Sequence, residues 1–266
     1  MGELGDFLLS RRAKVSPEQV GLRAGGRRRV PGLRREELAQ LAGISVEYYQ
    51  RLEQGRANRP SQEVLDAIAR VLSLDDVERA HLVALVGPPR DDARSATPAV
   101  RPELRSMLDL MDRVAALVIT DGFDVLAANP PAVRLLGDAV SGPAANLARH
   151  LFLVPSARDL YVDWADVAAA TAAQLRLAVG RHPADAGLAA LIADLTRDSA
   201  DFRVLWATQD VELRTAGAKR LRHPELGVLA LNYENFEAPG NPRQRLVTLT
   251  PDTNGSSSAA AFHLLD

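Results

Sequence analysis

The sequence contains no cysteine, which excludes disulfide frameworks, thiolate nucleophiles and cysteine-ligated zinc sites. It also has no apolar run long enough to span a bilayer. The first residues, MGELGDFLLSRRAKV, place their basic side chains after the apolar stretch, whereas a signal peptide places them before it. We therefore expect a soluble cytoplasmic protein that has no membrane partner.

Common catalytic motifs are missing as well, because the chain has no HExxH, no GxxxxGKS or GxxxxGKT, and no GxSxG. No two of the five histidines are spaced three or four residues apart, so we expect no metal site. The Asp and Glu residues are scattered over predicted helix faces, where they serve solubility. We expect neither an enzyme nor a resident cofactor.

The charge of the chain is unevenly distributed. Residues 1–60 hold 12 Lys and Arg against 7 Asp and Glu, a net charge of +5, so the rest must carry −7 of the total of −2. This asymmetry indicates a basic module that meets a polyanion and an acidic module that does not.

The length of 266 residues is sufficient for two domains. Helical periodicity, together with N-caps at Ser45 and Ser61, predicts five short helices within residues 1–86. The segment GPPRDDARSATPAVRP (87–102) contains four prolines and predicts a linker. Residues 103–266 are then expected to form the second domain.

The second domain is predicted to mix strands and helices. Two β-prone runs, AALVIT and FDVLAAN, flank Asp121-Gly122, which is a strong hairpin signal. A helix is expected after Asn129, more helices within residues 144–209, and then three strands separated by HPELG and PGNP. This order predicts an α+β domain with one antiparallel sheet and helices on one side of it.

Residues 33–54 have the spacing of a helix-turn-helix, with two short helical segments separated by Gly43 and the Ser45 cap. The short turn sets the second helix across the first, so that its N-terminal half can enter the DNA major groove. A five-helix interaction domain that shares this geometry and binds no DNA is the alternative.

The second helix of this motif has an inner and an outer face. We expect Tyr49 and Leu52 to face the core, together with Leu38 and Leu41 of the preceding helix. The side chains left outside belong to types that can read base edges: Glu47, Tyr48, Gln50 and Arg51. Two alternatives stay open, since Glu47 could simply favour the helix dipole and Tyr48 could be a partly packed surface aromatic.

The stretch RREELAQLAGISVEYYQRLEQGRANRPS resembles the XRE family, the phage repressor and Cro type of helix-turn-helix regulator, over about residues 33–86. The resemblance implies that bases are read by the exposed start of the second helix, at Val46, Glu47, Gln50 and Arg51. It also implies that phosphates are contacted at the start of the first helix and after the second, by Arg34, Arg35, Arg56 and Arg59. Such contacts position the protein and make binding strongly salt-dependent.

The connection before this motif, SPEQVGLRAGGRRRVPG, is longer than that of simple phage repressors. Its arginines Arg27, Arg28 and Arg29 have two open interpretations. They form either a solvated loop or a basic arm that follows the DNA backbone or the minor groove.

The second domain, from NLARHLFLVPSARDLYVDW to GAKRLRHPELGVLALNYENF, resembles the ligand-binding domain of MmyB-like regulators. These transcription factors combine an XRE N-terminus with a PAS-like C-terminal domain. The resemblance covers essentially the whole chain, including the Arg-rich connection. It implies a hydrophobic pocket for a small molecule, with a fatty acid or a similar amphiphile as the effector.

An anionic head group in such a pocket would need a partly buried arginine. We expect Arg149 or Arg158 to supply it. The remaining wall is expected to contain Asn129, Tyr161, Trp164 and Trp206. The alternative is that the two tryptophans and Phe152 are plain core, and that both arginines are structural ion-pair partners.

Together these features predict a ligand-responsive transcription regulator. Residues 1–86 would bind double-stranded DNA as a homodimer on a near-palindrome, and residues 103–266 would sense a small hydrophobic effector. The alternative function is a DNA-binding protein whose second domain is only a dimerisation or protein-interaction module.

Overall fold

The computed structural model describes residues 2–22, 32–57, 60–87, 99–142, 144–238 and 241–252. The chain divides into two compact units. The first comprises Met1–Asp91 with the short segments Gly180–Ala184 and Thr208–Glu212, and the second comprises Asp92–Val179, Asp185–Ala207 and Leu213–Asp266. The expected linker, residues 87–102, falls largely outside the described residues.

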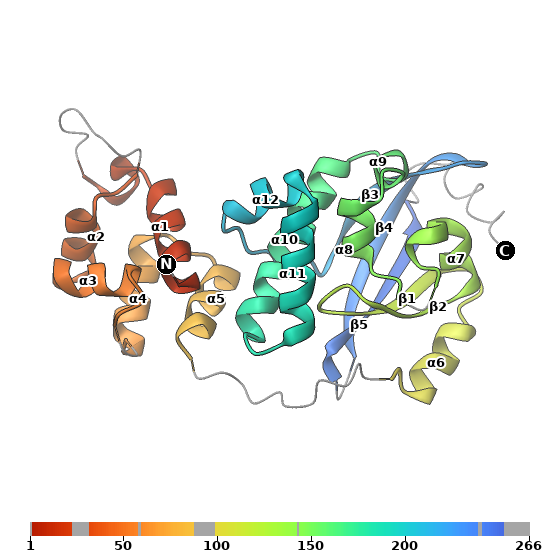
Figure 1. Ribbon diagram of the computed structural model, residues 1–266, viewed down its shortest axis with the longest axis horizontal. Coiled ribbons are helices and arrows are strands. Elements are labelled where there is room, and N and C mark those ends of the chain that lie inside the picture. Colours follow the sequence, from red (N-terminus) through yellow and green to blue (C-terminus); the bar gives the residue numbers. More distant parts are fainter. Residues whose placement is uncertain are drawn as a thin grey trace. The chain divides into compact units, whose positions relative to one another are not determined.

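The described part of the N-terminal unit contains the five predicted α-helices (Figure 1). They are α1 (Glu3–Lys14), α2 (Arg35–Ala42), α3 (Val46–Glu53), α4 (Gln62–Val71) and α5 (Asp76–Val86), and a 3-10 helix (Pro17–Val20) follows α1. Both predicted N-caps are confirmed. Ser45 Oγ accepts a hydrogen bond from Tyr48 N at 3.1 Å, and Ser61 Oγ accepts one from Val64 N at 3.4 Å.

The core of this unit confirms most of the predicted inner face. Tyr49 is 0% exposed, Leu52 1% and Leu38 0%. The prediction that Leu41 also faces the core is wrong, because its side chain is 39% exposed. The buried stripe of α2 runs through Leu38 and Ala39. With 3.6 residues per turn, that stripe leaves Leu41 on the outer flank of the helix.

A buried carboxylate, that of Glu53, joins three helices of the unit. Its side chain is 2% exposed, and its two oxygens accept hydrogen bonds from Arg12 Nε at 2.7 Å and Arg35 Nε at 2.5 Å. Arg12 donates a second hydrogen bond to the carbonyl oxygen of Leu33 at 2.6 Å. The hydrogen bond from Arg35 to Glu53 is the main cause of the raised pKa of Arg35. Glu53 thus ties α3 to both α1 and α2.

The C-terminal unit contains a five-stranded antiparallel sheet in the order β2-β1-β5-β4-β3 (Figure 1). Its strands are β1 (Ala115–Thr120), β2 (Val125–Ala128), β3 (Ala216–His223), β4 (Gly227–Ala238) and β5 (Asn241–Pro251). The predicted hairpin around Asp121-Gly122 and the three C-terminal strands are confirmed. In the centre of the sheet β1 lies beside β5, where Leu117 pairs with Val247.

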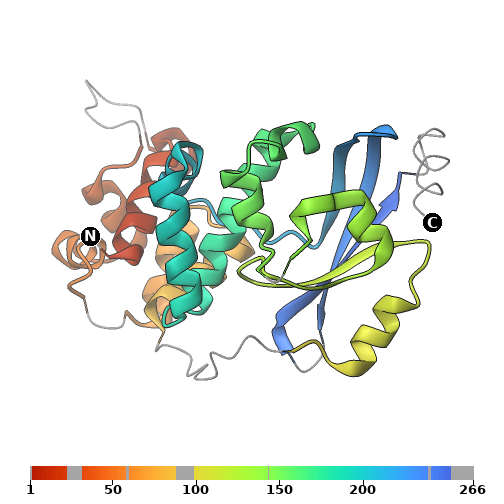
Figure 2. The same cartoon turned by 45° about the vertical axis from the view of Figure 1, so that its right-hand side comes forward.

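Seven further α-helices are described in this part of the chain. They are α6 (Pro102–Asp109), α7 (Pro130–Leu136), α8 (Leu147–Leu153), α9 (Ala157–Leu160), α10 (Trp164–Arg181), α11 (Ala186–Asp198) and α12 (Ala200–Ala207), and a 3-10 helix (Gly137–Ala139) follows α7. Leu117 and Ile119 of β1 join the main core with α7, α8, α10, α11 and α12. Val118, which points to the opposite face, packs in a second core with Leu108 of α6. The expectation of helices on one side is therefore wrong, because α6 covers the other face of the sheet (Figure 2).

Asn129 connects the start of α7 to β1 and to the residues before β1. It is 0% exposed. Its Oδ1 accepts from Ala132 N at 3.0 Å and Ala116 N at 2.9 Å, and its Nδ2 donates to Met111 O at 2.7 Å and Val114 O at 2.8 Å. An asparagine amide offers two acceptor positions and two donors, so this side chain is fully used within the protein.

Replacing Asn129 by alanine should destabilise the C-terminal unit by about 3–4 kcal/mol, because the cap is lost and buried backbone groups lose their partners. Both tryptophans, Trp164 and Trp206, lie in this unit, so tryptophan fluorescence in urea follows its unfolding. The matched control is Asn232→Ala, which removes an exposed asparagine of β4. Equal stability of the two variants would contradict the structural role of Asn129.

Glu53→Gln should destabilise the N-terminal unit by about 3 kcal/mol, because it leaves the buried Arg12 guanidinium without its carboxylate. This unit contains no tryptophan, so its loss of helix is followed by far-UV circular dichroism. Glu36→Gln, at an exposed position of α2, is the control and should cost less than about 0.5 kcal/mol. If the Glu53→Gln protein unfolded at the same midpoint as the wild type, the ion network would not stabilise the fold.

Candidate functional site

The turn between α2 and α3 consists of Gly43, Ile44 and Ser45. Gly43 has φ 68°, in the left-handed region that glycine adopts without strain. Its N–H donates to Gln40 O at 3.2 Å, and the N–H of Ile44 donates to Ala39 O at 3.0 Å. These two hydrogen bonds end α2 in the manner of a Schellman motif. Because Ser45 caps α3 at once, the turn between the two helices is short and well defined.

The outer face of α3 presents the residues expected to read bases. Glu47, Gln50 and Arg51 are exposed, and Val46 is partly buried. The Arg51 guanidinium lies 5.6 Å from the centre of the Tyr48 ring, within the range of a cation–π contact. Tyr48 therefore supports the side chain of Arg51, a contact that the sequence alone did not indicate.

The arginines expected to contact phosphates differ in their surroundings. Arg34 and Arg56 are exposed. Arg35 is 44% exposed while its Nε is paired with Glu53, so it has a structural role beside the expected one. Arg59 lies outside the described residues, as does the segment Arg27–Arg29.

The arginines expected to bind an anionic head group both form ion pairs. Arg149 on α8 contacts Asp194 on α11 at 2.7 Å, and this contact holds the pKa of the Asp194 carboxyl below its ordinary value. Arg158 contacts Asp201 at 2.6 Å, and its guanidinium lies 3.8 Å from the centre of the Trp164 ring. Each arginine is thus committed to a partner on a neighbouring helix.

The other residues expected at the ligand take part in packing. Tyr161 is 6% exposed, and burial raises the pKa of its hydroxyl group to about 12. Trp164 Nε1 donates to the carbonyl oxygen of Leu151 at 3.1 Å. Trp206 stacks on Phe202 with ring centres 5.3 Å apart. The fully buried Asn129 completes this set, with its amide used inside the fold as described above.

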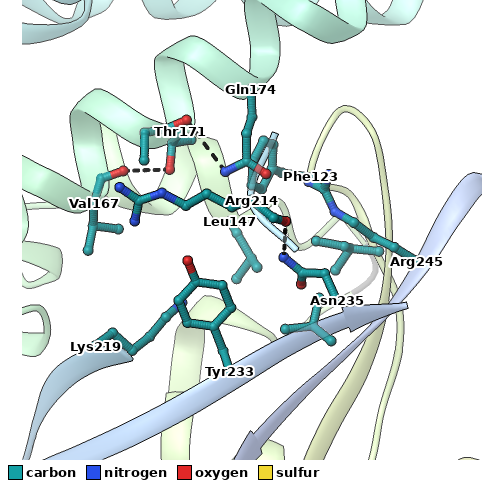
Figure 3. A pocket seen from close by; sticks show the side chains of 13 residues that line it. Phe123, Leu147, Val167, Thr171, Gln174, Arg214, Lys219, Tyr233, Asn235 and Arg245 are labelled. Carbon is teal, nitrogen blue, oxygen red and sulfur yellow. Dashed lines mark hydrogen bonds between the residues drawn. The ribbon is translucent and has the colours of Figure 1, made fainter. Parts of the chain in front are cut away.

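A cavity of about 80 Å³ lies between α10 and the main-core face of the sheet (Figure 3). Its apolar wall includes Ile119, Phe123, Leu147, Val167 and Val247. None of the six residues expected to bind the ligand lines this cavity, and their part in ligand binding stays a prediction.

Basic side chains enter the same cavity from three segments of the chain. Lys219 lies on β3, Arg245 on β5, and Arg214 just before β3 (Figure 3). Burial, and then the charges of Arg214 and Arg245, lower the pKa of Lys219 to about 8. The sequence did carry a signal, because Lys219 lies two residues before the buried Leu221, and Arg245 two residues before the buried Val247, so each cation shares the inner face of its strand. A cation in register with core residues of a strand indicates a polar site on the inner face.

No group of three or more His, Asp or Glu residues in the described ranges is arranged to hold a metal ion. Over the same ranges, no helix is both long and apolar enough to cross a membrane.

Comparison with protein families matches both units. Residues 3–82 match a helix-turn-helix domain, and residues 100–265 match the MmyB-like transcription regulator ligand binding domain. A search among curated proteins found no match. The two matches agree with the short turn between α2 and α3 and with the α+β architecture of the second unit, and they identify a DNA-binding regulator and not an enzyme. The chain therefore belongs to the family of MmyB-like transcription regulators, with a helix-turn-helix domain followed by a ligand-binding domain.

Proposed function

We propose that this regulator is a cytoplasmic homodimer that binds a two-fold symmetric DNA operator, and that a small hydrophobic molecule of the fatty-acid class controls this binding. The observation that carries the proposal is the outer face of α3. There, exposed Gln50 and Arg51 follow a short, capped turn at the position where a helix-turn-helix reads the major groove.

Base reading is assigned to the start of α3, at Val46, Glu47, Gln50 and Arg51. Arginine can donate two hydrogen bonds to a guanine, and glutamine can pair with adenine. The contact of Arg51 with Tyr48 reduces the conformations open to its long side chain. We therefore regard Arg51 as the main base contact, supported by Tyr48.

Phosphate contacts are assigned to Arg34, Arg35, Arg56 and Arg59. The exposed Arg34 precedes α2, and its backbone N–H is already bonded to Glu37 Oε2 at 2.7 Å, so the start of the helix is well ordered. Arg35 is anchored by Glu53. A positively charged helix start next to the reading helix suits the DNA backbone.

A dimer is proposed because one short reading helix contacts few base pairs, and two-fold symmetry doubles the length of the site. The two half-sites would lie about one helical turn, or 10 base pairs, apart. Selection from a random DNA library, followed by native mass spectrometry of the complex, tests this. Two inverted half-sites bound by two chains are expected, whereas a single half-site bound by one chain would contradict the dimer.

The effector is assigned to the cavity of the C-terminal unit, which combines an apolar wall with polar side chains, as small-molecule sites do. A second candidate function is a domain that only dimerises or binds another protein. The cavity volume favours that candidate, since about 80 Å³ is small against the roughly 300–1,000 Å³ of sites that enclose a drug-sized ligand.

Arg51→Ala should weaken binding to the selected operator by about ten- to a hundredfold and leave binding to unrelated DNA nearly unchanged, because a base contact is lost. Arg34→Ala should weaken binding to both kinds of DNA alike. It should also reduce the slope of log affinity against log salt concentration by about one, because one phosphate contact is lost. Fluorescence anisotropy with labelled duplexes at several salt concentrations separates the two effects. Arg79→Ala, at an exposed position of α5, is the control. If Arg51→Ala bound the operator as tightly as wild type, the assignment of α3 as the reading helix would be wrong.

Dodecanoate should raise the unfolding midpoint of the C-terminal unit in the lipid-free full-length protein, monitored by tryptophan fluorescence. At a hundred times its dissociation constant, a ligand that binds only the folded state adds about 2.7 kcal/mol. Absence of any shift over a series of fatty acids of increasing length would favour the interaction module.

A further inference from the structure

The face of the sheet that lies opposite the main core is only partly covered. On this face α6 packs against β1, β2 and β5, where Leu108 of the helix meets Leu246 of β5 (Figure 2). Among the residues that the structure describes, β3 contributes nothing to this second core, and β4 contributes only its last residue, Ala238. The outer face of β3 and β4 is therefore left without a covering layer.

This uncovered surface, which we call the β3–β4 face, consists of every second residue of the two strands. Its members are Val228, Ala230, Asn232, Glu234 and Phe236 on β4, and Ala216, Ala218, Arg220 and Arg222 on β3. All of them except the half-buried Ala230 are exposed. Phe236 is 52% exposed and Val228 46%. An exposed phenylalanine and valine on one sheet face are suited to an interface.

The apolar residues of β4 are arranged symmetrically about Asn232. Val228 precedes it by four residues and Phe236 follows it by four, which is about 13 Å in each direction at 3.3 Å per residue. Consider two copies of this face in contact, related by a two-fold axis that passes at Asn232 and lies perpendicular to the strands. Phe236 of each copy then meets Val228 of the other, so the apolar contact forms twice.

The charged residues of the face obey the same symmetry. Arg220 is the cross-strand partner of Ala230, and Arg222 is that of Val228. The two-fold rotation therefore brings Glu234 of one copy beside Arg220 of the other, and Arg222 beside Phe236. Arg220 already bonds to Asp163 at 2.9 Å, whereas Glu234 and Arg222 have no side-chain partner among the described residues. The face is thus complementary in charge to a second copy of itself.

Pairing of two sheets edge to edge is disfavoured. β3 is the edge strand, and part of its free edge is already used, because Val162 N donates to the carbonyl oxygen of Arg220 at 3.1 Å. The strand Ala216–His223 carries Lys219, Arg220 and Arg222 and no acidic residue. Two such strands placed side by side would repel each other. The face of β3 and β4, and not their edge, is the surface suited to a second copy.

We propose that the β3–β4 face is the dimer interface of this regulator, and that it packs against the same face of a second copy around a two-fold axis at Asn232. The inference rests on the proposed function, which requires a homodimer, and it names the surface that forms the dimer. Packed sheet faces lie about 10 Å apart, and the small side chains of Ala216, Ala218 and Ala230 permit that approach.

The size of the face indicates a weak dimer. Two short strands offer less than the roughly 800 Å² per partner of a standard interface, so we expect self-association in the micromolar range. A palindromic operator would then hold two chains close together and favour the pair.

Chemical cross-linking tests the position of the axis. The chain contains no cysteine, so Asn232→Cys introduces a single thiol at the proposed axis. In the dimer two such thiols face each other, and bismaleimidoethane should link most chains into covalent pairs, with and without the selected operator. Ala190→Cys, at an exposed position of α11, is the matched control and should give few pairs.

Sedimentation velocity of the full-length protein tests the contacts. Phe236→Glu should weaken self-association at least about a hundredfold, because the contact occurs twice in each dimer. Glu234→Lys should weaken it at least about tenfold, since a lysine would then lie beside Arg220. Val204→Glu, at an exposed valine of α12, is the control and should associate as wild type does. Tryptophan fluorescence confirms that each variant is folded.

The outcomes separate this interface from the homodimer itself. A dimer that tolerates Phe236→Glu, or whose Asn232→Cys thiols do not cross-link, would overturn the interface while the homodimer stands. A chain that stays monomeric both free and on its operator would contradict the proposed homodimer. If the Asn232→Cys thiol of such a monomer also resisted a simple maleimide, another segment of the same chain would cover the face, and a second copy would be excluded as its occupant.

Discussion

The buried carboxylate of Glu53 is the constraint on which the DNA-binding unit depends. It belongs to the last turn of α3, the helix whose outer face presents Gln50 and Arg51, and it is held by Arg12 of α1 and Arg35 of α2. A buried charge is tolerated only where such partners satisfy it, so the three helices must keep one arrangement. The same ion network that stabilises the fold therefore fixes the orientation of α3, the helix that we propose to read the bases, relative to α1 and α2.

The C-terminal unit uses polar groups in two different ways. Asn129 satisfies all of its hydrogen-bonding capacity inside the fold and so joins α7 to β1. The cations at Arg214, Lys219 and Arg245 instead face a cavity. The first arrangement is closed and structural, whereas the second borders a space of about 80 Å³.

Local signals in the sequence predicted most of the elements. Caps at Ser45 and Ser61 and the inward face of Tyr49 and Leu52 depend on neighbours a few residues away, and all are confirmed. The cavity was harder to predict, because the packing of α10 against the sheet and the register of the strands bring together lining residues that range from Ile119 to Val247 in the chain. We predicted ligand contacts for arginines and tryptophans, such as Arg149 and Trp206, that take part in ion pairs and ring packing within the fold. Tryptophans and arginines suit ion pairs and core packing as well as they suit a ligand.

The central claim is that an amphiphile in the second unit changes DNA binding by the first. The most direct test is fluorescence anisotropy of the full-length protein on its selected operator, titrated with dodecanoate. We expect a change in operator affinity of at least about fivefold, in either direction, when dodecanoate saturates the protein. An operator affinity that stays constant at saturating dodecanoate would contradict the account, because the two sites would then not be coupled.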